Sequence, residues 1–250
     1  MIVSHSRKFV FIHVPKAAGS SLTFALASIA GDDAIVTPLE DRVEGFHARN
    51  FSGTFNPLPE LAFRPRLAGE TLAQLKRKQA FYSHMPWWRI RNRIGRAAWR
   101  SYFKFCFERD PWERITSMYF YLQQQHGLKS RPGEPSFDRW LEALMRKQPE
   151  FVSPRMLYSD SRGNIQVDFV GRYESLRPHL AKVLQELGIS ESEGAAVIDS
   201  LPTLKSQYRR GQSIPITEQS RTLLRTVFDW DRVVGYPDDP DAAPVPRGGV

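Results

Sequence analysis

Residues 9–21, Phe9-Val10-Phe11-Ile12-His13-Val14-Pro15-Lys16-Ala17-Ala18-Gly19-Ser20-Ser21, form the stretch that decides the fold. The apolar run that opens it is β-branched and aromatic and stops at Pro15, which favours a buried strand. Hydroxyl residues and then helix formers come after Gly19, so a helix is predicted from near Ser20 to Gly31. The stretch therefore predicts a strand, a loop and a helix in succession.

The loop of this unit, Pro15 to Ser21, has the properties of an anion-binding site. Backbone N–H groups and the dipole at a helix start favour a bound phosphate or sulfate. The loop is not a Walker A loop, because Lys16 precedes Gly19 by three residues, whereas the Walker lysine directly follows its glycine. The alternative interpretation is a strand-to-helix turn with a surface lysine and capping serines.

A second strand-to-helix junction is predicted at residues 102–117. The alternating, aromatic segment 102–108 predicts a strand that ends at Arg109. The text Asp110-Pro111-Trp112-Glu113 supplies an N-cap, a first-turn proline and an acidic third residue, so a helix should run from there to about residue 126. Arg109 and Ser117, two helical turns apart, could grip one phosphate together. The alternative is a capped helix with a salt bridge from Arg114.

The remaining segments alternate between predicted strands and predicted helices. A further strand is expected at 167–173 and another could form at 80–83, and further helices are expected at 71–78, 137–147, 175–187 and 217–228. Alternation of this kind predicts an α/β fold with a central, mostly parallel sheet flanked by helices and with ligands at the carboxyl ends of its strands. We expect one domain over residues 1–236, with an insertion or long loop at about 38–70 and a disordered tail at 237–250.

Together, the two junctions resemble the paired signatures of the sulfotransferase superfamily, which uses 3′-phosphoadenosine-5′-phosphosulfate (PAPS) as donor. The first family motif is a Pro-Lys-x-x-Gly-Ser/Thr-Ser/Thr loop, and the second is Arg-x7-Ser across a strand-to-helix junction. The stretch RDPWERITSMYFYL at 109–122 resembles the carbohydrate sulfotransferases and their soluble bacterial relatives in particular. The segment 167–189 and the late DWDRVVGYP at 229–237 are also similar to that branch. The resemblance implies a sulfotransferase fold of the P-loop-NTPase-like type.

The resemblance also implies roles for individual residues. Lys16 would contact the sulfate and the bridging oxygen, and Arg109 with Ser117 would bind the 3′-phosphate. Ala17 stands where the family often has a hydroxyl residue, so donor binding should rely more on backbone N–H groups. The remaining donor-binding residues implied are Ala18, Gly19, Ser20 and Ser21 in the loop and, from a loose likeness to a late clamp in the cytosolic branch, Arg209 and Arg210.

His84, in the segment Phe81-Tyr82-Ser83-His84-Met85-Pro86, is the predicted catalytic base. It follows a predicted strand, histidine accepts a proton near neutral pH, and the segment resembles a Gly/Ser-His-x-Pro stretch of the carbohydrate sulfotransferases. His13 is expected to pack or to hydrogen-bond behind the site. The substitutes for the base are Glu44 and His47.

Trp87 and Trp88, directly after His84, could offer an apolar platform to a sugar ring or could pack in the core. Arg89 begins a row of arginines that would attract an anionic acceptor if the segment is helical, or would form a solvated helix face. The other members of this row are Arg93, Arg96 and Arg100. We expect Trp87, Trp88 and Arg89 to bind the acceptor.

Composition sets wider limits. The 250 residues carry a formal net charge of +8, which predicts acidic partners. A single cysteine, Cys106, cannot form an intramolecular disulfide, and we find neither a signal peptide nor a transmembrane segment, so a cytoplasmic location is expected. No cluster with metal-ligand spacing is found, so no metal is expected.

The hypothesis from sequence is a PAPS-dependent sulfotransferase that acts on a hydroxyl of a carbohydrate or glycolipid, and the basic charge favours an anionic acceptor. The alternatives are a kinase-like nucleotide-binding enzyme and a noncatalytic basic protein that binds nucleic acid. The loop order argues against the kinase. The absence of a recognisable nucleic-acid-binding motif argues against the basic binder. The sequence does not indicate the acceptor's identity or the oligomeric state.

Overall fold

The computed structural model describes the chain except residues 41, 126–136, 148–151, 203–213, 216 and 234–250. Its centre is a sheet of five strands in the order β3-β1-β2-β4-β5. The strands are β1 (Ile2–Ser4), β2 (Phe9–Ile12), β3 (Ile35–Val36), β4 (Phe103–Glu108) and β5 (Phe169–Arg172). β2 pairs in parallel with β4 and β4 with β5, whereas β1 is antiparallel to both β2 and β3. Four strands therefore share one direction, and the predicted α/β fold with a mostly parallel sheet is confirmed.

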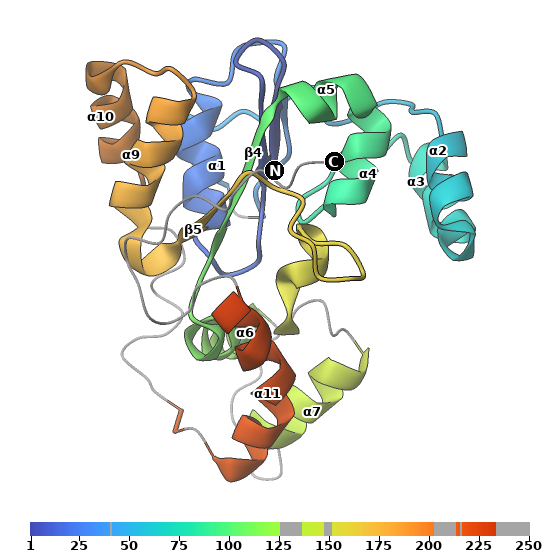
Figure 1. The fold of residues 1–250 in the computed structure, drawn as a ribbon, viewed down its shortest axis with the longest axis vertical. Helices are drawn as coiled ribbons and strands as arrows, with labels where there is room; N and C mark the ends of the chain where they lie inside the picture. The colour runs from blue at the N-terminus through green and yellow to red at the C-terminus, as the bar shows by residue number, and fades with distance from the viewer. Residues whose placement is uncertain (41, 126–136, 148–151, 203–213, 216, 234–250) are drawn as a thin grey trace.

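Helices cover both faces of this sheet (Figure 1). One face carries α1 (Gly19–Ala27), α9 (Leu176–Glu186) and α10 (Glu191–Asp199). The other side holds α2 (Leu58–Phe63), α3 (Ala68–Lys76), α4 (Trp87–Ile94) and α5 (Arg96–Ser101). A third group, α6 (Pro111–Gln125), α7 (Phe137–Lys147) and α11 (Glu218–Val233), lies beyond the carboxyl end of β4. Short 3-10 turns are found at Pro65–Leu67, Pro154–Leu157 and Tyr173–Ser175.

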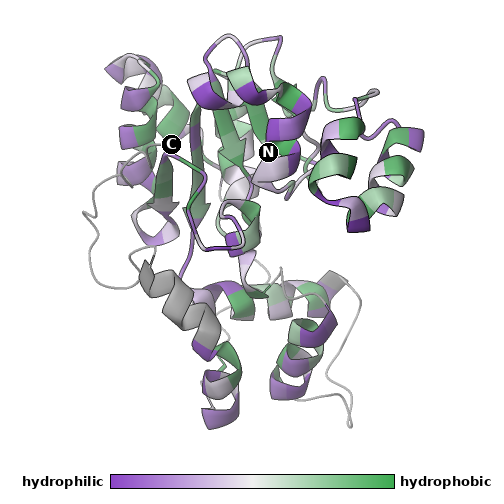
Figure 2. Ribbon diagram, turned by 45° about the vertical axis from the view of Figure 1, so that its right-hand side comes forward, coloured by the Kyte–Doolittle hydropathy of each residue, from purple (hydrophilic) through white to green (hydrophobic). Residues whose placement is uncertain are grey.

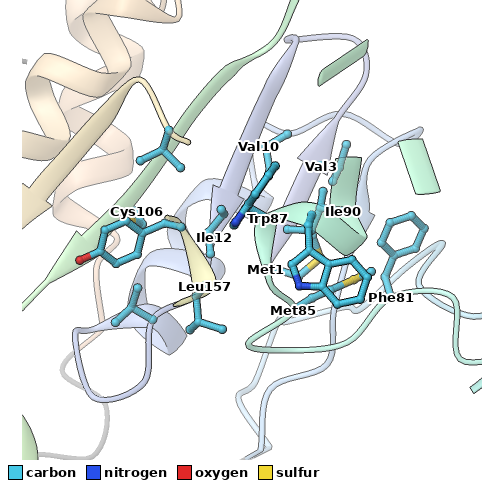
Figure 3. Close-up of a cluster of buried hydrophobic side chains, with 14 of the residues drawn as sticks. Met1, Val3, Val10, Ile12, Phe81, Met85, Trp87, Ile90, Cys106 and Leu157 are labelled. Atoms are coloured by element: carbon cyan, nitrogen blue, oxygen red, sulfur yellow. The ribbon is translucent and has the colours of Figure 1, made fainter. Parts of the chain in front are cut away.

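Alternate residues of the strands enter two different cores. Phe9 and Phe11 pack with Leu22 and Leu26 of α1 in one cluster. Val10 and Ile12 point into the opposite cluster, which Figure 3 shows closing against Trp87, Ile90 and Leu157. This period of two is the pattern of a sheet that is buried on both faces. Figure 2 shows the same division, with hydrophobic strands inside and hydrophilic residues on the outward sides of the helices.

Several predicted elements are found where the sequence placed them. The helix at 137–147 has the predicted bounds, and α6 begins at Pro111 with the Glu113 N–H donating to Asp110 Oδ1 at 2.9 Å. α9 ends just before Gly188, whose φ of 69° is the left-handed conformation that stops helices. Local capping chemistry fixed these ends. The tail 237–250 and the predicted clamp residues Arg209 and Arg210 lie outside the described residues.

Three predictions about the middle of the chain are wrong. Residues 80–83 form no strand, because the sheet position beside β2 is taken by β1, which the sequence analysis missed. The segment read as an extended loop contains the helix α2. The segment 87–100 is helical but is broken by Gly95, whose φ is 90°, so the arginine row does not share one helix face.

Candidate active site

The two junctions that carry the sequence motifs open at the same edge of the sheet. β2 and β4 are neighbouring parallel strands, and Ile12 is paired in register with Cys106. Pro15 follows Ile12 by three residues, and Arg109 follows Cys106 by three residues. Because parallel strands present their carboxyl ends at one edge, the loop after β2 and the start of α6 lie side by side. The structure therefore brings the two motifs together.

The loop after β2 is held in an uncommon backbone conformation. Lys16 has φ 60° and Ala18 has φ 59°, which is the left-handed region that side chains other than Asn and Asp rarely adopt. This path lets α1 begin at Gly19, with a first intrahelical bond from the Leu22 N–H to the Ala18 carbonyl at 2.9 Å. The N–H groups of Gly19, Ser20 and Ser21 precede this first bond and therefore point out of the N-terminal end of the helix, as an anion-binding loop requires.

Gly19 is required by a close approach to His13. A Cβ built on Gly19 would overlap the imidazole at Cδ2 and Nε2 and would lie 2.8 Å from Cγ. His13 itself is buried, with its ring 6.3 Å from that of Phe11. The glycine of the loop therefore serves packing as well as anion binding: it lets α1 start directly over the His13 ring.

Lys16 lies over an aromatic ring of α6. Its Nζ is 3.9 Å from the ring centroid of Tyr121, and the Tyr121 hydroxyl donates to Glu40 Oε2 at 2.9 Å. Tyr121 is four residues after Ser117, so both occupy one face of α6. The sequence analysis missed Tyr121 and Glu40. The spacing from Ser117 was a usable signal for Tyr121, but no local pattern connects Glu40 to the loop.

Arg109 lies at the carboxyl end of β4 with its guanidinium partly engaged. It contacts Glu113 Oε2 at 3.2 Å, and its Cζ is 4.4 Å from the ring centroid of Tyr173. Its Nε is buried and has no hydrogen-bond partner among the described residues. The guanidinium is thus oriented by an aromatic face and keeps a donor for a further acceptor. Ser117 is half-buried on α6, two turns beyond the junction.

A buried ion pair stabilises the junction between β4 and α6. Arg114 Nη1 contacts Glu108 Oε2 at 3.0 Å, and the Tyr158 hydroxyl donates to Glu108 Oε1 at 2.8 Å. Both charged side chains are almost inaccessible to solvent. Burial raises the pKa of Glu108, while the Arg114 charge and the Tyr158 hydrogen bond oppose that rise. The pair ties the end of β4 to the first turn of α6, and Arg109 lies between them. The alternative interpretation of this segment is a capped helix with a salt bridge from Arg114. That salt bridge is present, and it is compatible with a binding role for Arg109.

His84 lies against the same loop through His13. Its Nδ1 is 2.8 Å from the His13 carbonyl oxygen, and the two imidazole centroids are 4.4 Å apart. A carbonyl can only accept, so the Nδ1 atom carries the proton and the lone pair is on Nε2. His84 has φ 58°, a third positive value within the candidate site. Strained backbone of this kind is concentrated at functional sites.

A groove opens beside His84. It has a volume of about 610 Å³, within the range of roughly 300–1,000 Å³ typical of ligand sites. Ser83 and Glu40 line it next to His84 and Tyr121, aromatic residues supply its apolar surface, and two cations lie on its wall. These further lining residues include Phe51, Phe81, Tyr82, Arg77 and Lys78. Glu44 and His47 are exposed and do not line it.

The predicted acceptor platform is not formed. Trp87 and Trp88 are only 4% and 5% exposed, and the Trp87 Nε1–H donates to the Ser159 carbonyl at 2.9 Å within the core that Figure 3 shows. Arg89 is 1% exposed and is paired with Glu70 at 2.8 Å. Burial of the two indole rings and pairing of the guanidinium with a carboxylate favour positions inside the protein, so these three side chains offer no surface to an acceptor.

The remaining sequence predictions concern clamps, metals and membranes. Arg209 and Arg210 lie outside the described residues. Within the described part of the chain, no group of three or more His, Cys, Asp or Glu side chains is arranged to hold a metal ion. None of the helices among these residues combines the length and the apolarity needed to cross a membrane.

Comparison with known proteins agrees with this geometry. Residues 1–229 match the model of the sulfotransferase family. A stretch of 110 residues, 43% of this chain, is 34% identical to an uncharacterized protein of Archaeoglobus fulgidus and covers 85% of that protein. No solved structure matches the chain at a significant level. Because the family match spans nearly the whole described fold, including the loop after β2, the junction at Arg109 and the His84 segment, this chain belongs to the sulfotransferase family.

Proposed function

We propose that the protein transfers the sulfuryl group of PAPS to a hydroxyl of a carbohydrate or glycolipid acceptor and releases 3′,5′-adenosine bisphosphate. One observation carries the proposal: the loop with Lys16 and the junction at Arg109 follow neighbouring parallel strands, and His84 bonds to the His13 carbonyl beside the first of these strand ends. Family membership supports sulfuryl transfer in general. The donor and the acceptor are the parts that the proposal adds.

The residues present fit a nucleotide with two phosphate positions. The N–H groups that precede the first bond of α1, together with Lys16, suit the 5′-phosphosulfate. The buried Nε of Arg109 and the Ser117 hydroxyl suit the 3′-phosphate, because charge-assisted bonds from guanidinium to phosphate are among the strongest available. The stacking of Arg109 on Tyr173 presets its orientation.

The chemistry then follows from the positions of two side chains. His84, with its proton on Nδ1, accepts the proton of the acceptor hydroxyl at Nε2 as the hydroxyl oxygen bonds to sulfur. The bond from sulfur to the bridging phosphate oxygen breaks, and the electron pair stays on that oxygen. Lys16 and the start of α1 stabilise the charge that develops there.

The groove beside His84 is the proposed acceptor site. Phe51, Phe81 and Tyr82 offer apolar and aromatic surface to a sugar ring, and Arg77 and Lys78 favour an acceptor that carries negative charge. Ser83 connects this surface to His84, so an acceptor hydroxyl at that end would lie next to the base. We also infer a cytoplasmic location from the single thiol, Cys106, which is free and buried.

A turnover assay with PAPS labelled in the sulfuryl group tests the proposal. The variants Lys16→Ala and His84→Ala are compared with the unaltered protein over a panel of oligosaccharides and glycolipids. We expect Lys16→Ala to abolish nearly all transfer. His84→Ala should lower turnover by about 10²–10⁴-fold, the usual contribution of a general base, with little change in donor affinity. Near-normal turnover by His84→Ala would exclude it as the base, and no transfer to any acceptor would contradict the proposed acceptor class.

A further inference from the structure

A second cavity lies between α2 and the junction of α4 with α5. It has a volume of about 370 Å³ and is lined by residues of α2, of the C-terminal half of α4 and of the start of α5. His84 precedes the N-terminal end of α4, and eight helical residues span about 12 Å. The cavity is therefore separate from the candidate active site. Its walls are Pro59, Ala62 and Phe63 on one side and Arg91, Asn92 and Arg96 on the other.

Two donor atoms of the residues that line this cavity have no hydrogen-bond acceptor among the described residues. No acidic residue lines it. Arg91 Nε and Asn92 Nδ2 are buried and have no hydrogen-bond partner among the residues that the structure describes. Buried polar atoms are almost always bonded, so two residues of the cavity wall that each leave a donor unsatisfied favour a ligand that accepts.

Neighbouring arginines of the same helix show how unusual this is. Arg93 Nε contacts Glu60 Oε1 at 2.5 Å, and Arg89 Nη1 contacts Glu70 Oε1 at 2.8 Å. Buried Glu60 and exposed Glu70 thus pair with the inward-facing arginines Arg93 and Arg89. The Arg91 guanidinium forms neither a salt bridge nor a hydrogen bond within the described part of the chain, although Arg91 lies between the other two in sequence.

Arg91 is nevertheless held in place. Its Cζ is 4.9 Å from the ring centroid of Trp87 and 5.1 Å from that of Phe63, so the guanidinium is fixed by two aromatic rings. Burial, and next the charge of Arg96, lower the pKa of Arg91. The guanidinium groups of Arg91 and Arg96 repel each other, and the side-chain amide of Asn92 lies next to Arg91 in sequence with its Nδ2 unsatisfied. No carboxylate among the described lining residues balances this positive charge.

We propose that this cavity is an oxyanion-binding site that takes a sulfate group, either as the free ion or as the ester of a sugar whose ring packs on Phe63. Arg91 and Arg96 supply the charge, and Asn92 supplies a neutral donor. The guanidinium fork matches the oxygens of sulfate, and Phe63, 46% exposed, together with Pro59 and Ala62 forms an apolar wall for the rest of a ligand. The site does not require the proposed function, because binding alone defines it.

The test observes Arg91 directly. In ¹⁵N-labelled protein the Nε–H resonance of Arg91, assigned by its loss in Arg91→Lys, is followed during titration with sodium sulfate at constant ionic strength. We expect a saturable shift. In Arg96→Met the half-saturating concentration should rise at least tenfold. Arg100→Met removes an equal charge from the exposed surface of α5, outside the cavity, and should leave the titration unchanged.

A second titration with glucose 6-sulfate separates the two sources of the group. Tighter binding than that of free sulfate, lost in Phe63→Ser, assigns the site to a sugar ester, and equal binding assigns it to the free ion. A shift of the Arg91 resonance that does not saturate, or that is the same in Arg96→Met and Arg100→Met, overturns the proposal. Since the readout is one side chain of the cavity, sulfate bound at the donor loop does not produce these outcomes.

Discussion

The contact between Gly19 and His13 predicts that the substitution Gly19→Ala will destabilise the fold. Gly19 is the first residue of α1 and does not have a positive φ, so the backbone accepts alanine. On helix propensity alone, alanine in a helix would stabilise by up to about 1 kcal/mol. The new Cβ, however, would overlap Cδ2 and Nε2 of the His13 imidazole and lie 2.8 Å from Cγ.

The imidazole has little room to move aside. His13 is 6% exposed, and its ring lies against those of Phe11 and His84. Overpacking of this kind costs typically about 1–3 kcal/mol. A change of 1 kcal/mol shifts the melting temperature of a protein this large by roughly 2–4 °C, so the variant should melt roughly 2–12 °C lower.

A double-mutant cycle measured by urea and thermal unfolding isolates the clash. His13→Ala removes the imidazole, so adding Gly19→Ala in that background should be neutral or stabilising, and the coupling energy should be about 1–3 kcal/mol. Gly69→Ala is the matched control, because Gly69 is also near the start of a helix and a Cβ there meets no atom within 4 Å. Equal stability of Gly19→Ala and the unaltered protein, with no coupling, would refute this account of the loop.

Two further substitutions probe the supports of the site. Tyr121→Leu removes the ring beneath Lys16, and the loss of a cation–π contact of about 0.5–2 kcal/mol should lower turnover roughly 2–30-fold, whereas Tyr121→Phe keeps the ring and most of the turnover. Equal turnover of the two variants would contradict this role. Arg114→Met leaves Glu108 buried without its partner and should cost about 3–5 kcal/mol at pH 7. Because Arg114 lowers the pKa of Glu108, removing Arg114 raises that pKa further. The loss of unfolding free energy should therefore shrink as falling pH protonates the carboxyl group. Unfolding measured at pH 7 and pH 5 checks this, and a loss that is larger at pH 5 would contradict it.

The parts of the fold that sequence could predict are those set by local chemistry. The capped start of α6 and the left-handed Gly188 after α9 are local signals and were found. The strand β1 is three residues long and β3 only two, so neither has enough residues to show a period, and both were missed. Their pairing is decided by distant partners, such as Ile2 with Phe11 and Val36.

The candidate site divides in the same way. Motif spacing identified the residues of the loop after β2, Arg109 and His84 as candidates, and their roles stay predictions. The burial of Trp87 and Trp88 could not be seen from sequence, because it depends on how α4 packs on the sheet. Neither could the pairing of Arg89 with carboxylates of α2 and α3, which are 29 and 19 residues away in the chain, respectively. Glu40 meets Tyr121 across 81 residues, a contact that no local pattern encodes.

Isothermal titration with 3′,5′-adenosine bisphosphate and with AMP tests the central claim most directly. If the carboxyl ends of β2 and β4 form the donor site, the bisphosphate should bind at least tenfold more tightly than AMP, because only the bisphosphate has the 3′-phosphate that Arg109 and Ser117 are proposed to hold. The double variant Arg109→Met/Ser117→Ala should abolish this preference while still binding AMP. Equal affinity of the unaltered protein for the two nucleotides, or a preference that survives in the double variant, would contradict the account.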